Sequence, residues 1–194
     1  MKKFNLASLA KLLTLTLLLT SSAVYAQTVP QDSVYQLDNK WLDQDGKERL
    51  LSSFSGKKQI ISLIYTHCLH TCPTIVSTMQ AIEHKLSEAA RQHVGFILVS
   101  LTPSTDTPAV MHEFAQQRQL NLSHWSLLTG TAEDVRSLAM VLDIKYQNVA
   151  DNEVNHSNLI TVLDQQGRIQ FQELGLLSNA SKTAEQLNNM AAQQ

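Results

Sequence analysis

The stretch IISLIYTHCLHTCPT, residues 60–74, joins a buried strand to a helix and contains both cysteines of the chain. Residues 60–65 are almost all apolar and rich in β-branched side chains, which predicts a strand covered on both faces. Pro73 suits the first turn of a helix, where a backbone N–H would have no partner. Cys68 and Cys72 therefore stand at the junction between a strand and a helix N-terminus.

Strands and helices alternate along the rest of the chain. The turn sequences DQDG at 43–46 and DQQG at 164–167 predict a hairpin near each end. Alternating strands and helices between them imply a parallel sheet core with an antiparallel edge. We therefore expect an α/β fold, a thioredoxin-like sandwich with a central mixed sheet and flanking helices. The expected strands are 60–65, 94–101, 125–128, 159–163 and 169–174, and the expected helices begin near Pro73, Thr107, Thr131 and Ser181.

Local signals define two of these helices further. Thr131 followed by Asp134 resembles a capping box. The helix after Pro73 is expected to reach Ala89, because apolar residues recur there at helical spacing. They are Val76, Met79, Ile82, Leu86 and Ala89.

Residues 1–26 have the composition of a cleavable export signal. Lys2 and Lys3 precede an apolar run at 12–19, and small residues stand at the two positions that a signal peptidase reads before Gln27. The apolar run has about half of the roughly 20 residues that a spanning helix needs. We expect export, to the periplasm, with an uncleaved leader as the alternative link to a membrane. Residues 27–194 suit one domain.

The charge balance argues against a nucleic-acid partner. Lysine and arginine number 15 against 17 aspartate and glutamate, and three of the positive charges belong to the leader. No basic field of the kind that neutralises phosphates is present.

A structural disulfide is the ordinary interpretation of two cysteines in an exported protein. A bond between Cys68 and Cys72 would close a ring of only five residues. So short a loop restrains the unfolded chain least, and the bond would stabilise the fold little. The pair is better explained by chemistry: it can hold a soft metal, cycle as a disulfide, or do both.

The position of the thiols favours both chemistries. Amide groups at a helix N-terminus lower the pKa of a thiol, and the thiolate is both nucleophile and metal ligand. Thiolate sulfur selects Cu(I), zinc or iron–sulfur clusters. Two cysteines are too few for a four-thiolate site, so a histidine would have to complete it.

The seven histidines differ as candidate ligands. His67 and His70 lie in the thiol loop, where they could tune the thiolates or remain exposed. His156 follows a polar, loop-like stretch, 148–155, and precedes the strand at 159–163, which faces the thiol loop in a thioredoxin-like fold. A lone histidine there is usually structural, but it could complete a Cys₂His site. The remaining four are expected to be solvated or to cap helices: His84, His93, His112 and His124.

Several motifs together resemble the SCO/SenC family of copper proteins. They are YTHCLHTCPT at 65–74, DTP at 106–108 and VNHS at 154–157, with FSGK at 54–57 and WSLLTG at 125–130 as further landmarks. The resemblance implies a thioredoxin-like fold that binds one copper ion, Cu(I) or Cu(II), through Cys68, Cys72 and His156. It also implies a metallochaperone that delivers copper to the copper centre of cytochrome c oxidase, or reduces its thiols.

The chain departs from the family pattern at positions outside these three residues. Family members commonly have Pro-Asp after the first cysteine, where this chain has Leu69 and His70. The stretch TPSTDTP at 102–108 lacks an acid and a basic residue of the familiar motif. The expected partners are a copper-receiving protein or an oxidase subunit, and a thiol reductant.

A thiol–disulfide oxidoreductase is the alternative, with Cys68 and Cys72 as its redox-active, catalytic pair. Thioredoxins have a cis-proline opposite their thiols, but no proline of this chain lies within 148–163, where His156 stands instead. The pattern therefore leaves enzymatic activity open. A static disulfide is the third and plainest hypothesis.

Overall fold

The computed structural model describes residues 29–67, 71–148 and 154–191. The predicted export signal at 1–26 lies outside these residues, and so do Cys68 and His70. Within the described ranges, no helix combines the length and hydropathy that a bilayer span requires.

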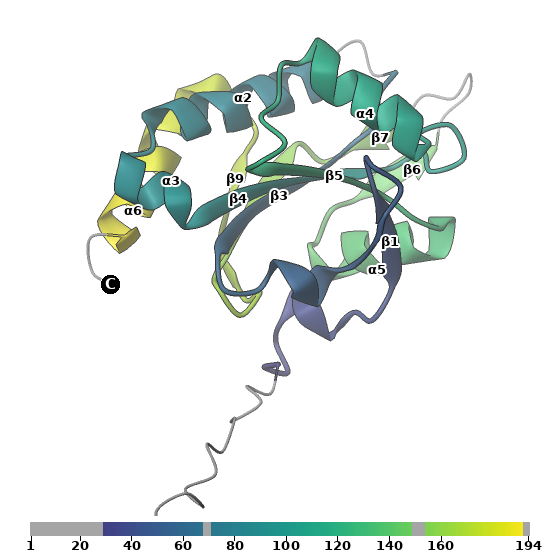
Figure 1. Ribbon diagram of the computed structural model, residues 1–194, viewed down its shortest axis with the longest axis horizontal. Helices are drawn as coiled ribbons and strands as arrows, with labels where there is room; N and C mark the ends of the chain where they lie inside the picture. Colours follow the sequence, from purple (N-terminus) through teal and green to yellow (C-terminus); the bar gives the residue numbers. More distant parts are fainter. Residues whose placement is uncertain (1–28, 68–70, 149–153, 192–194) are drawn as a thin grey trace, which may run out of the picture.

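Helices and strands follow the predicted order except for α3 and for β6 and β7, which were not predicted (Figure 1). The strands are β1 (Lys40–Asp43), β2 (Glu48–Leu50), β3 (Lys58–Ile64), β4 (Val94–Ser100), β5 (Trp125–Thr129), β6 (Tyr146–Asn148), β7 (Val154–His156), β8 (Leu159–Leu163) and β9 (Ile169–Leu174). The helices are α2 (Thr71–Lys85), α3 (Glu88–Gln92), α4 (Pro108–Gln117), α5 (Ala132–Val141) and α6 (Ala180–Ala191), with short 3₁₀ turns η1 (Val34–Gln36), η2 (Leu51–Phe54) and η4 (Leu177–Asn179).

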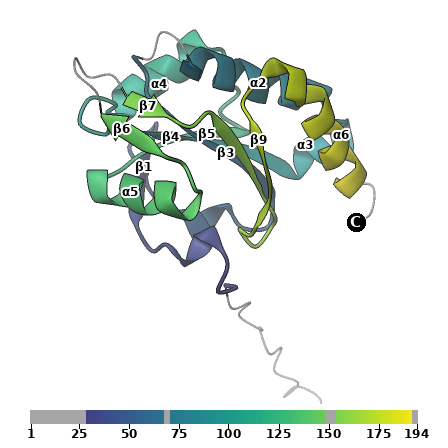
Figure 2. The same ribbon diagram turned by 180° about the vertical axis from the view of Figure 1, so that it is seen from behind.

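A seven-stranded mixed sheet forms the centre of the molecule, in the order β2-β1-β5-β4-β3-β8-β9. β3, β4 and β5 pair in parallel, and antiparallel hairpins flank them on both sides. Every residue of β3 and β4 is buried, as their continuous apolar pattern predicted. Figures 1 and 2 show α2, α4 and α6 on one face of the sheet and α5 on the other. The predicted α/β sandwich is confirmed.

The long helix predicted after Pro73 is two helices. α2 ends at Lys85, and α3 begins after Ser87, whose hydroxyl accepts a hydrogen bond from the N–H of Ala90. This N-cap starts a new helix at a different angle, so that Ala90 is buried and Ala89 is exposed. The apolar spacing through Ala89 was therefore a wrong guide to the end of α2.

A second, two-stranded sheet was not predicted. β6 and β7 pair antiparallel, with Tyr146 opposite His156, in the region that the sequence indicated as a polar loop. Strands this short and polar show no alternation of apolar and polar residues in the sequence, so the sequence pattern gave no strand signal here.

The directions of the strands bring distant segments together at one end of the sheet. β3 and β4 run parallel, and β8 runs antiparallel to β3. The ends of β3 and β4 and the start of β8 consequently lie together. The chain enters the thiol loop from this end of the sheet.

The predicted capping box of α5 is confirmed, and it gives a pH-dependent contribution to stability. The Thr131 hydroxyl accepts from the N–H of Asp134, and the Asp134 carboxylate accepts from the N–H of Thr131. Burial alone would raise the pKa of Asp134, but hydrogen bonds from Thr131 and Asn39 outweigh burial and hold this pKa below 3.8. Stabilisation by the carboxylate is therefore complete above about pH 4 and is lost as the pH falls through the lowered pKa.

We expect Asp134→Asn to lower the free energy of unfolding by about 1 kcal/mol at pH 7, because it removes cap acceptors and a charge at a helix N-terminus. Urea unfolding at several pH values measures this difference, which should shrink towards zero below the lowered pKa. Glu133→Gln is the matched control, since it removes a charge from the same helical turn without touching the cap. An equal loss in both variants, or a loss independent of pH, would contradict the assignment.

Candidate metal site

The structure describes the three predicted ligands to different extents. His156 is the last residue of β7, and Cys72 belongs to the first turn of α2. Cys68 lies outside the described residues, and the Cys72 side chain is not described either. The position of His156 is therefore the one that can be compared with the predicted site.

His156 lies beside the end of the strand that leads to the thiols. Its ring meets the ring of Tyr65 edge to face, with centroids 6.2 Å apart and planes at 76°. Tyr65 is buried and follows β3 directly. Tyr65 stands three residues before Cys68 in the sequence, at the start of the loop that contains the thiols. The structure thus brings His156 to the start of the thiol loop.

The hydrogen bonding of His156 suits a metal ligand. Its Nδ1 lies 3.1 Å from the carbonyl oxygen of Ser157. A carbonyl only accepts, so Nδ1 carries the proton and Nε2 carries the lone pair. A second hydrogen bond of this kind commonly orients histidines that bind metals.

The environment also keeps the imidazole neutral. Burial lowers the pKa of His156 below its ordinary 6.5, although the hydrogen bond to the Ser157 carbonyl acts in the opposite direction. A neutral imidazole is the form that binds a metal ion.

The β6–β7 hairpin positions this histidine. The N–H of Ser157 donates to the Lys145 carbonyl at 2.8 Å, and the Ser157 hydroxyl accepts from the Lys145 N–H at 3.2 Å. His156 itself stands opposite Tyr146. A polar pocket of about 410 Å³ opens beside these residues, with His156 in its wall. The hairpin therefore holds the ring against β3 and leaves an approach to it from outside.

A buried carboxylate holds the segment that enters the thiol loop. Asp106 is fully buried and accepts hydrogen bonds from the N–H of Thr66 at 3.2 Å and from its hydroxyl at 2.6 Å. Sequence analysis identified Asp106 only as part of the DTP motif and gave it no role. An aspartate directly before a Thr-Pro helix start would ordinarily be assigned to the cap, so the sequence offered no signal for its contact with Thr66.

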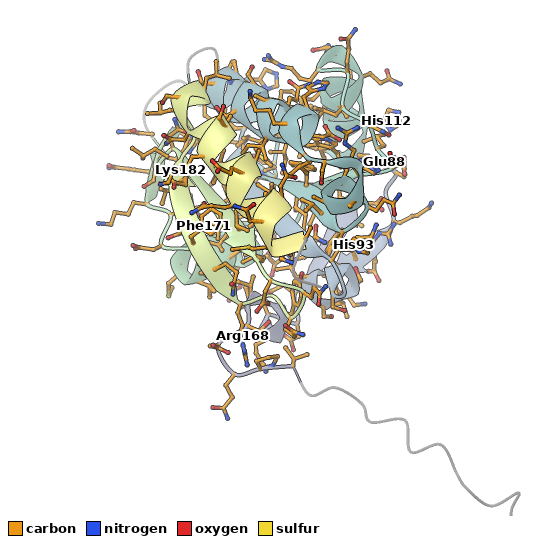
Figure 3. The ribbon with its side chains drawn as sticks, turned by 90° about the vertical axis from the view of Figure 1, so that its left-hand side faces the viewer. Glu88, His93, His112, Arg168, Phe171 and Lys182 are labelled. Atoms are coloured by element: carbon orange, nitrogen blue, oxygen red, sulfur yellow. The ribbon has the colours of Figure 1, made fainter. Side chains whose placement is uncertain are left out.

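The other histidines stand apart from this arrangement. His124 lies 3.4 Å from Glu83 and His112 lies 3.4 Å from Asp45, while His84 is exposed. His93 is exposed and forms the C-cap of α3. His93 and His112 are on the far side of α6 from Phe171 of β9 (Figure 3). His67 is the exception: it is exposed at the start of the thiol loop, with its Nδ1 3.1 Å from the Thr66 hydroxyl and 4.0 Å from Asp106.

The described side chains do not by themselves complete a metal site. Among them, no three His, Cys, Asp or Glu groups come together to hold one ion. Both thiols fall outside that set, so a site here would depend on them. Two thiolates and a neutral imidazole form a soft donor set that fits copper.

Curated proteins of similar sequence include SCO1 homologues. The chain is 32% identical over 91 residues to a Bacillus subtilis protein, "SCO1 protein homolog", and the match covers 47% of each chain. The chain thus aligns with about half the length of this curated relative.

Solved structures support the fold. A copper-bound ScoI from Arabidopsis thaliana superposes with a TM-score of 0.68 at 20% identity, covering 78% of this chain and 96% of that one. BsSco, described as having a disulfide switch and belonging to the Sco family of cytochrome c oxidase assembly proteins, gives a TM-score of 0.69 at 21% identity, covering 81% and 96%.

The family comparison covers far more of the chain than any single relative does. The SCO1/SenC family model matches residues 28–192, which include the thiol loop, Asp106 and His156. The chain belongs to the SCO1/SenC family.

Proposed function

We propose that this protein is an exported, periplasmic copper metallochaperone that holds one copper ion through Cys68, Cys72 and His156. The observation that carries the proposal is the contact of the neutral His156 ring with Tyr65, three residues before the first cysteine. Copper is cargo in this proposal, so the site must bind the ion and also release it. Residues 27–194 act as one domain, and residues 1–26 direct export.

The donor set supports copper over the alternatives weighed from the sequence. Two thiolates and an imidazole suit Cu(I) as a three-coordinate soft site, and Cu(II) can accept a further oxygen or nitrogen. Family membership and the copper-bound relative from Arabidopsis agree with this choice.

The receiver of the copper is a copper-binding protein or a cytochrome c oxidase subunit. The description of BsSco as a cytochrome c oxidase assembly protein supports this class of partner. In the same role the reduced pair reduces a disulfide at the oxidase copper centre to two thiols. Cys68 and Cys72 become a disulfide in that step, and an external thiol reductant restores them.

Thiol–disulfide exchange is the second candidate function. The disulfide switch described for BsSco favours it, because that relative shares the fold and the family. The same pair would serve, since the thiolate that binds copper is also the nucleophile of exchange.

We expect the reduced protein to bind about one copper per chain, and we expect loss of binding in Cys68→Ser and Cys72→Ser because each removes a thiolate. His156→Ala should weaken Cu(II) binding by at least about tenfold and change its EPR spectrum, since the imidazole is a ligand. Titration with competing chelators, followed by absorbance and EPR, measures both. His84→Ala is the control, because His84 is exposed on α2 and lies near its end.

Unchanged copper affinity in His156→Ala would remove this residue from the site. A separate assay addresses the second function: the purified protein is mixed with a generic protein disulfide and a thiol reductant. We expect slow turnover compared with a dedicated oxidoreductase. Rapid turnover without copper uptake would reverse the order of the two functions.

A further inference from the structure

Asp106 is a buried acid with an unusual set of partners. Its carboxylate is fully buried and accepts four hydrogen bonds, two from Thr66 and one each from the hydroxyls of Ser100, at 2.7 Å, and Thr102, at 2.9 Å. The Thr66 amide can only donate and the three hydroxyls can each donate, so all four contacts suit a carboxylate that accepts. Four hydrogen bonds from three segments hold this side chain in place.

No cationic side chain compensates this charge inside the described part of the protein. No lysine or arginine there forms an ion pair with Asp106, and its nearest basic group is the exposed His67, at 4.0 Å. The donors are two kinds of neutral group, hydroxyls and an amide. A buried charge without a counterion is costly to keep, and such groups are retained mainly where they have a task.

The hydrogen bonds of Asp106 join three segments at the end of the sheet where β3 and β4 finish. Thr66 leads from β3 into the thiol loop, Ser100 ends β4, and Thr102 lies in the turn before α4. Both the backbone and the side chain of Thr66 are held, which fixes the start of the loop on the rigid end of the sheet. Cys68 is only two residues further along the sequence.

We propose that Asp106 is a positioning residue for the Cys68–Cys72 pair: it anchors the start of the thiol loop and provides a fixed negative charge beside it. This inference rests on the proposed copper function and adds the group that prepares the site. The anchor reduces the freedom that the loop loses when a metal binds. The charge favours a bound cation and disfavours a pair of free thiolates.

Two consequences of the proposal can be separated by mutation. Asp106→Asn removes the negative charge and turns one acceptor into a donor. It therefore affects both the hydrogen bonds that hold Thr66 and the electrostatic effect on the thiols. Thr66→Val keeps the charge and nearly the same shape but removes the 2.6 Å bond to the loop segment. Ser100→Ala removes a bond on the sheet side of the same carboxylate.

We expect Asp106→Asn to weaken copper binding by about tenfold and to make the reduction potential of the cysteine pair less negative, because the thiolates lose a neighbouring negative charge. Thr66→Val should weaken copper binding with little change in potential. Ser100→Ala should lower the free energy of unfolding and weaken copper binding less than Thr66→Val does, because both bonds from Thr66 to the carboxylate remain. Affinity is measured by chelator competition, and the potential by equilibration with glutathione buffers.

Asp43→Asn is the control for a buried aspartate, because Asp43 lies in β1 and bonds to Arg49, away from the thiol strand. In Asp43→Asn, the reduction potential of the cysteine pair and the copper affinity should equal those of the wild type. An unchanged potential in Asp106→Asn, or equal copper affinity in wild type and Thr66→Val, would overturn the proposal. If the wild type takes up no copper, the proposed function fails, but the potentials still test Asp106. Thr66→Val also tests it if Asp106→Asn does not fold.

Discussion

Antiparallel pairing of β8 with β3 is the constraint on which the candidate site depends. Ile61 stands opposite Thr161, and the Ser62 hydroxyl donates to the Leu159 carbonyl at 2.7 Å. This register brings the residues before β8, including His156, to the end of β3, where the thiol loop begins. A slip by one residue would turn every side chain of β8 to the other face and break specific bonds, including the one that the Thr161 hydroxyl accepts from Gln172. These bonds therefore help to fix the position of the histidine.

The two groups that border the thiol loop differ in their electrostatics. Burial keeps His156 neutral, so it is ready to bind a metal without first losing a proton. Asp106 is a buried acid with four hydrogen-bond donors around it and no lysine or arginine partner in the described structure. His156 ends β7 and Asp106 precedes α4, and each contacts a residue that leads from β3 into the thiol loop, Tyr65 and Thr66 respectively. In our proposal the negative charge of Asp106 favours a bound cation and disfavours two free thiolates.

Local patterns in the sequence predicted most of the fold, and contacts between distant segments account for what they missed. The buried strand at 60–65 and the Thr131 capping box depend on neighbouring residues, so both were readable. Asp106 is bonded to Thr66, forty positions away, and no spacing rule predicts such a contact. His156 was selected partly through the family resemblance, since a single histidine before a strand has no distinctive pattern. The end of α2 was readable in principle, because Ser87 is a good N-cap.

The two candidate functions use the same cysteines, and the surroundings decide between them. A disulfide exchanger needs its attacking thiol to meet a substrate sulfur directly, and access then matters most. Here a histidine held by the β6–β7 hairpin contacts Tyr65, the residue that follows β3 and leads towards the thiols. Its Nδ1 is bound to the Ser157 carbonyl, which leaves the ring in the neutral form that binds a metal. These features are the reason that we propose copper binding ahead of disulfide exchange.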